Sequence, residues 1–435
     1  MTVPDAPHSM NIWSVTAMGI GAMVGAGIFA LLGVVALAAG DLTYVAFLIG
    51  GCIAALSGYS YAKLSARYPD AGGIAVFFDR AFGAGRVSGT LSLIFLLTLA
   101  ATIAMVAKAF GSYAAPLAFG AVDPWAVNAF ASAIIVVLAL LNFGGSKFVG
   151  KAEILLVGIK LSVLAILICA GGWGMTMHAP ITHAAPRLLP VIGSVGITML
   201  AYAGFGMMPN AAGSVANPKA TIPHAIYLAI AIVTLVYVAL AVVVVDSVPV
   251  AELSRDANTV VAVAARPVLG QAGYIIVSIT ALLATASCIN SWIFTTMQIA
   301  TAMAKAGQLP QMFAHLFWRQ GTLGLLLSVA AILIAINVFD LTALASIASA
   351  TFVLSHMAVH IAHWRLIDET KGSRLLVGLG LLTMSTVLAI FLWSIAPTQP
   401  WALGLIAVFL AGSWGAENLL TWLSGAKPKT PAAIG

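Results

Sequence analysis

The chain of 435 residues is strongly apolar: hydrophobic side chains make up 62% of it, charged ones 7%, and its mean hydropathy is +1.08. Because soluble domains carry roughly 25% charged residues, these values exclude a soluble globular protein, a disordered chain and a disulfide-rich secreted scaffold. Cys52, Cys169 and Cys288 lie far apart in apolar segments, so we expect no disulfide framework and no metal site. Most of the protein surface is therefore predicted to face lipid.

Apolar segments long enough to cross a bilayer follow one another along the whole chain. A transmembrane helix needs about 20 apolar residues, and on that basis we predict about twelve spans. They cover residues 12–39, 44–67, 86–116, 125–142, 149–172, 188–211, 222–245, 269–306, 323–337, 341–363, 375–395 and 401–423. The predicted fold class is an all-α membrane protein with a single transmembrane domain over residues 1–435.

Lysines and arginines are unevenly distributed over the predicted loops. If the N-terminus is cytoplasmic, the outer loops hold Arg187, Arg255 and Arg266, and the inner loops and span ends hold most of the others. This asymmetry follows the positive-inside rule and predicts a multi-pass protein of the cell (inner) membrane with both termini in the cytoplasm. It also explains the net charge of +6 without a nucleic-acid partner. The first apolar run is too long for a signal-peptide core, so we expect the N-terminus to be retained.

Two spans contain glycine-rich interruptions. Gly19, Gly21, Gly25 and Gly27 crowd into the first span, and residues 201–206, AYAGFG, interrupt the sixth. Each glycine weakens a helix by up to about 1 kcal/mol relative to alanine, so both segments are expected to unwind. Broken helices at matching positions of two halves indicate an inverted-repeat transporter with a binding site at the midplane. Free amides favour a carboxylate and free carbonyls favour an ammonium group, which together fit an amino-acid zwitterion.

Two alternatives exist for these glycines. Glycine clusters in membrane helices also form close-packing seams, and that interpretation stays open for each segment. The Gly-x-Gly spacing also occurs in dinucleotide-binding loops, but here no strand precedes it and no βαβ unit follows. We therefore expect no cofactor.

The same segments resemble the amino acid, polyamine and organocation transporter family. Residues 20–29, IGAMVGAGIF, are similar to its first-span signature, and residues 202–205, YAGF, to its sixth-span break. Residues 217–223, NPKATIP, and 303–310, MAKAGQLP, are similar to the segments that follow its sixth and eighth spans. The resemblance covers almost the whole chain. It implies the leucine-transporter-like five-plus-five inverted repeat, with residues 12–172 and 188–363 as repeats and 375–423 as two added helices.

The resemblance also implies which backbone groups would bind the substrate. These groups belong to the two broken spans. The substrate carboxylate would be held by the amides of Gly25, Ala26 and Gly27, and its ammonium group by carbonyls near Met23, Leu200 and Ala203.

Side chains of the sixth and eighth spans would complete the site. Tyr202 or Phe205 would close it as an aromatic gate, and Trp292 would border the side-chain pocket. Many members that carry cationic substrates have an acidic residue where this chain has Gly206, and many members have two more where it has Gly213 and Ser214. Without that carboxylate a dicationic substrate lacks a counter-charge, so the pocket, shaped also by Met105 and Met207, is expected to accept small neutral amino acids.

Lys108 and Lys160 are the basic residues deep within predicted spans. A charge at the bilayer centre costs at least ~2.5 kcal/mol on insertion scales, so such a residue indicates function, and desolvation lets a buried amine exchange its proton. Residues 150–154, GKAEI, which lead to Lys160, resemble the proton-coupled group of the family. That resemblance implies that Lys160 is a proton switch near Gly21 and Ser287. The alternative is a permanently charged lysine that fixes helix packing.

Other polar groups have simpler interpretations. Lys108 is expected to extend toward the headgroups, and Glu153 to form a surface ion pair with Lys151 worth under ~1 kcal/mol.

His356, His360 and His363 share one helical face. Such clusters bind metals in membrane oxidases, but only one cluster is present. We therefore favour histidines at the cytoplasmic end of a span, and no enzyme.

These observations predict a secondary active transporter that takes up small neutral amino acids with protons by alternating access. Its partners would be an amino acid, protons and the lipid bilayer. An amino acid or amine exchanger and a sodium-coupled symporter of the same fold are the alternatives. A sensor derived from a transporter, which binds without translocation, is the alternative from another class.

Overall fold

The structure is a computed structural model that describes residues 10–83, 85–120, 123–144, 149–175, 188–309, 313, 316–318, 321–397 and 399–424. These residues are almost entirely helical, which confirms the predicted fold class. The α-helices are α1 (Ile12–Ala26), α2 (Ile28–Ala39), α3 (Thr43–Arg67), α4 (Ile74–Phe82), α5 (Arg86–Phe119), α6 (Pro124–Gly144), α7 (Val149–Met175), α8 (Leu188–Ala201), α9 (Pro218–Ser247), α10 (Val250–Asp256), α11 (Val260–Lys305), α12 (Leu323–Val338), α13 (Leu341–Arg365), α14 (Ile367–Thr370), α15 (Arg374–Ile395) and α16 (Pro400–Ser424).

Short 3₁₀ helices and one small sheet complete the described residues. The 3₁₀ helices are η1 (Gly40–Leu42), η2 (Ala203–Ser214) and η3 (Ala257–Thr259). Strands β1 (Leu316–Trp318) and β2 (Gly321–Thr322) pair antiparallel after α11. This pair was not predicted, because strands of three and two residues are too short to leave a period-two pattern in the sequence.

The predicted spans coincide with helices. Nine helical stretches of the described residues are long and apolar enough to cross a membrane. The shorter apolar helices Ile12–Ala26, Leu323–Val338 and Pro400–Gly415 complete the set. The longest element, α11, contains Gly270 at φ 67°, a conformation that only glycine adopts freely, so it consists of two helices joined at a kink. The predicted eighth span begins at this kink.

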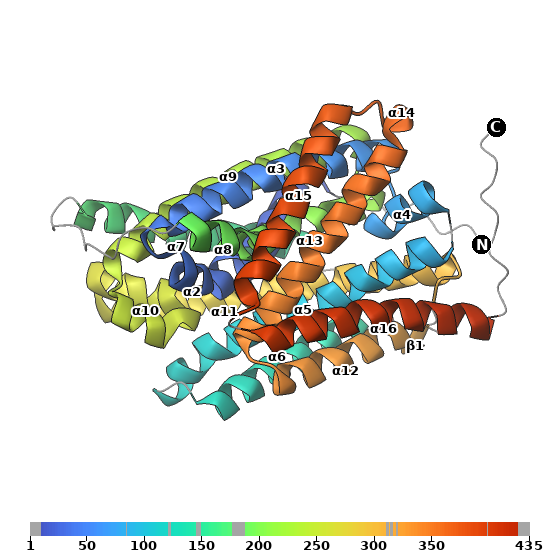
Figure 1. Cartoon of the computed structure of the whole chain (residues 1–435). Helices are drawn as coiled ribbons and strands as arrows, with labels where there is room; N and C mark the ends of the chain where they lie inside the picture. The colour runs from blue at the N-terminus through green and yellow to red at the C-terminus, as the bar shows by residue number, and fades with distance from the viewer. Residues whose placement is uncertain are drawn as a thin grey trace.

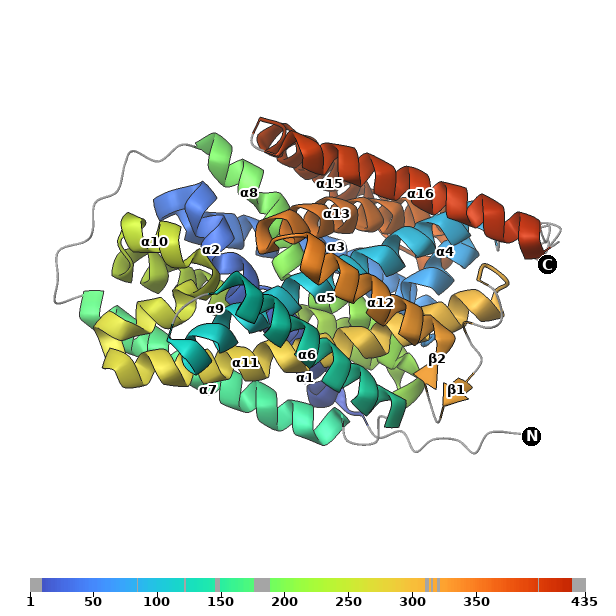
Figure 2. The same ribbon diagram turned by 90° about the horizontal axis from the view of Figure 1, so that it is seen from below.

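The helices form one bundle in which broken spans lie inside and added helices outside. α3 packs along α9, while α1 contacts α7, α9, α11 and η2. α13 and α15 cross the long helices obliquely in Figure 1, and α16 lies at the outer edge in Figure 2. The first span is therefore surrounded by protein, as a broken helix at membrane depth requires.

Each half of the chain carries a short helix after its second span. In the first half this is α4, and in the second half it is α10 followed by η3. Figure 1 shows α4 and α14 both toward one end of the bundle and α10 at the other. Equivalent elements at opposite faces are what an inverted repeat produces. Below, these two ends are called the α14 face and the α10 face.

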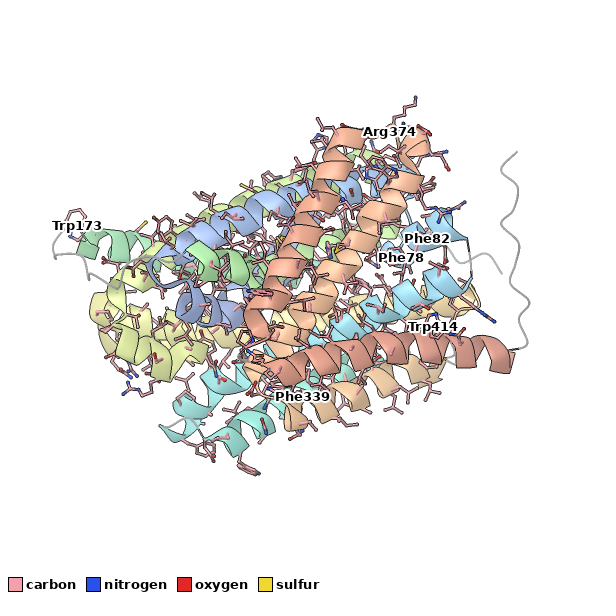
Figure 3. All side chains as sticks on the ribbon, in the orientation of Figure 1. Phe78, Phe82, Trp173, Phe339, Arg374 and Trp414 are labelled. Atoms are coloured by element: carbon pink, nitrogen blue, oxygen red, sulfur yellow. The ribbon has the colours of Figure 1, made fainter. Side chains whose placement is uncertain are left out.

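Aromatic side chains gather at both ends. Trp173 lies at the α10 face, whereas Phe78, Phe82 and Trp414 lie toward the α14 face, as Figure 3 shows. Trp173 and Trp414 are largely exposed. Tryptophans at two levels of an apolar surface are typical of the two membrane interfaces.

Candidate functional site

The first break is narrower than predicted. The helix is interrupted at Gly27 alone, between α1 and α2, rather than throughout residues 19–27. The Gly27 amide donates to the Met23 carbonyl at 2.6 Å, and the Gly27 carbonyl accepts from the Leu31 amide at 3.0 Å. Helical hydrogen bonds thus continue across the interruption.

Close packing explains the other glycines of this segment. A Cβ at Gly25 would overlap the Ala284 carbonyl and the Cys288 side chain of α11, and one at Gly21 would overlap the Glu153 carboxylate. A Cβ at Gly19 would lie 2.6 Å from the Met208 sulfur. The alternative interpretation of glycines as a packing seam therefore accounts for most of the first cluster, because three neighbouring elements approach its backbone.

The second break is confirmed. α8 ends at Ala201, and the chain continues from Ala203 as the 3₁₀ helix η2, which contains Pro209. A Cβ at Gly204 would lie 2.7 Å from the Met23 nitrogen. Because Gly204 has no side chain, η2 rests directly on the backbone of α1, and the two interrupted spans meet.

A tyrosine that the sequence analysis missed joins the two breaks. The Tyr237 hydroxyl, from α9, lies 2.5 Å from the Met23 carbonyl and 3.2 Å from the Ala201 carbonyl. The Met23 carbonyl, a predicted ammonium ligand, thus accepts from both Gly27 and Tyr237. Nothing in the spacing of α9 distinguishes Tyr237 from an ordinary buried aromatic residue.

The predicted binding residues are buried around this junction. Their exposure is at most 2% for those with an apolar side chain: Met23, Ala26, Leu200, Tyr202, Ala203, Phe205 and Trp292. The three glycines of the set, Gly25, Gly27 and Gly206, are buried too. The structure therefore represents a closed conformation, in which the Gly27 amide and the Met23 carbonyl bond within the protein.

The two candidate gate residues have different surroundings. The Tyr202 hydroxyl donates to the Phe47 carbonyl of α3 at 2.9 Å, and its ring packs on Tyr237. Phe205 instead packs edge-on against Tyr61 and His356, with ring centroids 5.3 and 5.4 Å away. Tyr202 is thus an anchor between α8 and α3, and Phe205 remains the candidate gate.

Gly206 faces the same aromatic group. A Cβ there would lie 3.6 Å from the Tyr61 hydroxyl and 3.7 Å from His356 Nε2, which is ordinary contact. The space beside Gly206 is therefore bordered by a phenol and an imidazole.

The predicted proton-coupling residues lie together. Lys160 Nζ donates to Ser287 Oγ at 3.1 Å, and Ser287 Oγ lies 2.7 Å from both carboxylate oxygens of Glu153. Since a hydroxyl has one proton, Ser287 accepts from the ammonium group and donates to the carboxylate. Lys160 Nζ is also 3.8 Å from Glu153 Oε1. The side chains of Lys160 and Glu153 are 1% and 8% exposed, and Gly21 leaves the room that the carboxylate occupies.

The prediction for Glu153 is wrong. It is buried, as a partner of Lys160 and Ser287, instead of lying at the surface, while the side chain of Lys151, its predicted partner, lies outside the described residues. Residues seven apart complete nearly two helical turns and share a face. The spacing between Glu153 and Lys160 could have revealed the pair, whereas proximity in sequence favoured Lys151.

The prediction for Lys108 also needs correction. Lys108 is buried and donates to the Asn128 side chain of α6 rather than reaching headgroups. The three histidines of α13 lie in the half of the helix that approaches the α14 face, and all three are buried. Among the described residues no group of histidine, cysteine and acidic side chains could hold a metal ion.

The family-like segment after α11 forms a contact at the α14 face. Gln308 donates to the Asp79 carboxylate of α4, and its Nε2 lies 2.9 Å from Ser88 Oγ of α5. Burial raises the pKa of Asp79 above its ordinary value, and the hydrogen bonds from Ser88 and Gln308 partly oppose this rise. Three elements are thus tied together where they emerge at this face.

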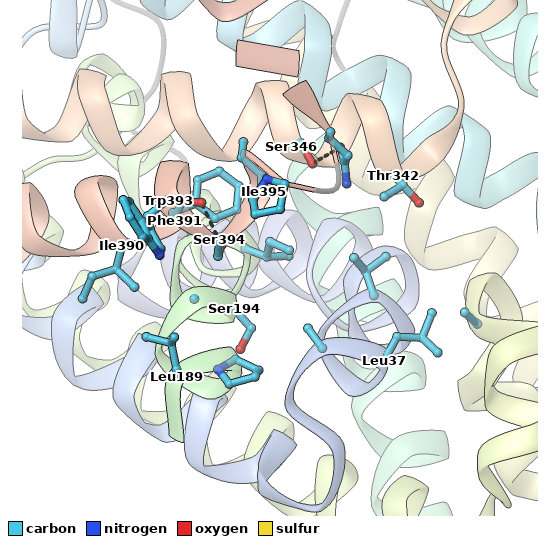
Figure 4. Close-up of a pocket in the computed structure, with 18 of the residues that line it drawn as sticks. Leu37, Leu189, Ser194, Thr342, Ser346, Ile390, Phe391, Trp393, Ser394 and Ile395 are labelled. Carbon is cyan, nitrogen blue, oxygen red and sulfur yellow. Dashed lines mark hydrogen bonds between the residues drawn. The ribbon is translucent and has the colours of Figure 1, made fainter. Parts of the chain in front are cut away.

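A pocket of about 530 Å³ lies elsewhere, between α2, α8, α13 and α15. Figure 4 shows mostly apolar residues around it, including Leu37, Leu189 and Phe391, with the hydroxyls of Ser194 and Ser346. None of the predicted binding residues lines it. It is therefore separate from the junction of the broken spans.

Comparisons with known proteins identify the family. The sequence model of the amino acid permeases matches residues 10–416. The inner membrane transport protein YbaT of Escherichia coli (strain K12) is 44% identical over 387 residues, 89% of this chain and 90% of that protein. The methylthioribose transporter of Bacillus subtilis (strain 168) is 25% identical over 328 residues, 71% of this chain and 69% of that protein.

Solved structures agree on the fold. A crystal structure of the manganese transporter of Eremococcus coleocola, in complex with an aromatic bis-isothiourea substituted compound, matches with a TM-score of 0.61 and 14% identity, covering 98% of each chain. This likeness concerns the fold alone. Together with the match over residues 10–416, it shows a multi-pass transporter rather than an enzyme. The chain belongs to the amino acid permease family, within the amino acid, polyamine and organocation transporters.

Proposed function

We propose that the protein takes up small neutral amino acids together with protons by alternating access, and that Lys160 carries the coupled proton. The observation that carries this proposal is the buried set of Lys160, Ser287 and Glu153, packed against the first broken span at Gly21. Burying an ionisable group at membrane depth costs free energy. The presence of such a group therefore indicates a role in transport. Here the Lys160–Glu153 pair of α7 lies against α11, through Ser287, and against α1, at Gly21. Alternating access must move these helices relative to one another.

The pair supplies a physical link between protonation and helix packing. With Lys160 charged, the ammonium group, the Ser287 hydroxyl and the Glu153 carboxylate satisfy one another. Loss of the proton leaves a buried carboxylate without its counter-charge, which costs several kcal/mol unless the surrounding helices rearrange. Protonation of Lys160 therefore favours the closed packing of α7 and α11 on α1.

The substrate class follows from the junction of the breaks. The backbone amides of Gly25, Ala26 and Gly27 would hold the carboxylate once the closed packing opens, and the carbonyls of Met23, Leu200 and Ala203 the ammonium group. Phe205 would act as the gate, with Gly206 and Trp292 at the side-chain pocket. Gly206 supplies no counter-charge, so a neutral side chain is favoured.

The proposal includes an orientation. Lys63, Arg67, Arg80, Arg365 and Arg374 belong to or adjoin α3, α4, α13 and α15 near the α14 face. By the positive-inside rule this face is cytoplasmic, and both termini with it, in the cell membrane. The repeats would then be residues 12–172 and 188–363, with 375–423 appended.

The experiment is uptake of labelled alanine, serine, leucine, glutamate and arginine into proteoliposomes under an inward proton gradient and then under a sodium gradient. Lys160→Met is compared with Lys108→Met, because both remove a buried lysine but only Lys160 pairs with Glu153, the residue packed on Gly21 of the broken span. We expect proton-driven uptake of alanine and serine that Lys160→Met abolishes while counterflow exchange survives. Lys108→Met should retain net uptake.

Other outcomes would assign a different function. Uptake that requires sodium, or exchange without net uptake in the parent protein, would replace proton symport by the corresponding mechanism. Binding without any translocation would indicate a sensor. Equal effects of the two lysine variants would return Lys160 to a packing role.

A further inference from the structure

A chain of buried hydrogen bonds runs from α13 to the α14 face. His360 Nδ1 lies 2.9 Å from Ser60 Oγ of α3, and Ser60 Oγ lies 3.0 Å from His363 Nδ1. His363 Nε2 lies 3.1 Å from Thr370 Oγ1 at the end of α14. All three histidines of α13 have no exposed surface. The chain uses no residue of the proposed binding site.

The chemistry of the donors gives this chain a direction. The Thr370 hydroxyl lies 3.0 and 3.1 Å from the carbonyls of Leu366 and Ile367, which can only accept, so its proton points to them. His363 Nε2 must then donate to Thr370, and its bare Nδ1 accepts the proton of Ser60. Ser60 in turn accepts from His360 Nδ1. All groups are neutral, and the free lone pair is at His360 Nε2.

A third histidine extends this arrangement toward the centre of the protein. His356 Nδ1 lies 2.9 Å from the Phe352 carbonyl, so it carries the proton and Nε2 is bare. His356 Nε2, His360 Nε2 and the Tyr61 hydroxyl have no hydrogen-bond partner among the described residues, although all are buried. Gly206 of the second break lies beside His356 and Tyr61. The bare Nε2 of His356, one helical turn before His360 on α13, thus lies beside the second break.

The groups around the chain are otherwise uncharged until it reaches the surface. Of the residues described on neighbouring elements, Tyr59 and Tyr61 of α3 pack against His363 and His356, and Gly380 of α15 packs against the His360 ring. The first charged group is Lys63, whose Nζ donates to the Lys371 carbonyl next to Thr370. Glu369 and Asp368 of α14 pair with Tyr68, Arg67 and Arg374.

We propose that His356, His360 and His363, linked through Ser60 to Thr370, conduct protons between the second break and the α14 face. A proton bonds to His360 Nε2 while the His360 Nδ1 proton passes to Ser60. The Ser60 proton passes to His363 Nδ1, the His363 Nε2 proton to Thr370, and the Thr370 proton to water. One proton enters and one leaves, and every hydrogen bond reverses. His356 delivers the proton to His360 from water in the opened site.

This inference rests on the proposed proton coupling, because a carrier that moves no protons needs no such path. It adds a route that Lys160 does not provide, since Lys160 bonds to Ser287 of α11 and pairs with Glu153 of its own helix, whereas the chain joins α3, α13 and α14. A purely structural role would need the same residues but would not depend on proton transfer through Ser60. The experiment therefore distinguishes hydrogen bonds that only stabilise the packing from hydrogen bonds that also conduct protons.

The key substitution is Ser60→Ala, which removes the bridging hydroxyl and leaves all histidines in place. Its matched control is Ser65→Ala, because Ser65 is equally buried in α3 but donates to the Tyr61 carbonyl within the helix. Ser60→Thr restores a hydroxyl at the same position. Each variant is reconstituted, and substrate-dependent proton influx is followed with an internal pH dye beside net uptake and counterflow exchange of alanine.

We expect Ser60→Ala to lower proton influx and net uptake by about tenfold or more, in line with the loss of a positioned proton-transfer group. Exchange should stay within about twofold of the parent, because it needs no net proton release at the α14 face. Ser65→Ala should match the parent protein in all three assays, and Ser60→Thr should recover proton influx. Nitrogen NMR of labelled histidines should show the Nδ1–H form at His356 and His360 and the Nε2–H form at His363.

Two results would overturn the inference, and they differ from each other. If the parent protein shows substrate-dependent proton influx and Ser60→Ala equals Ser65→Ala, the chain is structural and the proton coupling stands. If the parent protein shows no proton influx, the proposed function fails and the path fails with it. In the resting protein without substrate, an Nδ1–H form at His363 would contradict the direction assigned to the chain before a proton passes.

Discussion

Glu153→Gln tests whether the buried pair with Lys160 is a physical unit. The substitution keeps an oxygen that can accept from Ser287 and removes the negative charge 3.8 Å from Lys160 Nζ. Lys160→Met removes the positive charge while keeping an apolar side chain of similar length. The double variant leaves neither charge, so the two single changes and their combination form a complete thermodynamic cycle.

The structure sets the size of the expected effect. A surface ion pair contributes about 0–1 kcal/mol, whereas removing one member of a buried pair costs about 3–5 kcal/mol. With exposures of 1% and 8%, the second range applies. Because glutamine retains the bond from Ser287, we expect Glu153→Gln to cost about 2–4 kcal/mol. The double variant should lie within about 1–2 kcal/mol of the parent protein, since replacing a whole buried pair is often neutral.

Thermal unfolding in detergent measures the cycle. At roughly 2 °C per kcal/mol for a chain of this size, Glu153→Gln should lower Tm by about 4–8 °C. Asp368→Asn is the control, because Asp368 pairs with Arg374 in solvent and should leave Tm unchanged. Additive effects of the two single variants, or a Tm shift for Glu153→Gln no larger than that of the control, would refute the pairing.

Three further predictions concern packing and pH. Gly21→Ala should displace the Glu153 carboxylate and cost about 1–3 kcal/mol, whereas Gly158→Ala, where a Cβ meets nothing within 4 Å, should be neutral or stabilising in the same Tm assay. Tyr237→Phe should lower Tm by leaving carbonyls of both broken spans short of a donor, at a cost of about 1–3 kcal/mol; an unchanged Tm would show that this bond is dispensable. Because the pKa of Asp79 is raised, the folded state binds more protons there than the unfolded state, so stability should fall as pH rises from 3.8 through the raised pKa. Tm measured over that window should decline less in Asp79→Asn, and equal declines would contradict the assignment.

Much of the fold could be predicted because lipid imposes long apolar segments on the sequence. The second break could also be predicted from the sequence, since Gly204, Gly206 and Pro209 all disfavour a regular α-helix. The extent of the first break could not be predicted from glycine content alone. Glycine permits both unwinding and close approach, and only the positions of α7, α9 and α11 decide between them.

Site residues could be predicted where the sequence of a single span marks them. Contacts between residues of different spans were harder to predict. Lys160 stands out because a charge within an apolar run is conspicuous. Its partners come from α7 itself and from α11, and Ser287 lies 127 positions away along the chain. The α13 histidines are buried because α3, α14 and α15 cover them. The sequence of α13 alone does not indicate these contacts.

The bond from Tyr237 bears on whether this carrier can run without cargo. One hydroxyl proton serves two carbonyls, on Met23 and Ala201, which belong to different broken spans. In the proposed binding mode, a ligand ammonium group would take the Met23 carbonyl and leave the hydroxyl free to turn to Ala201. When the ligand departs, the hydroxyl supplies the missing donor again. Under the proposed function, a protein that satisfies these carbonyls itself would meet no unpaired-group penalty on closing unloaded and would reset without a counter-substrate, as net accumulation requires and obligatory exchange does not.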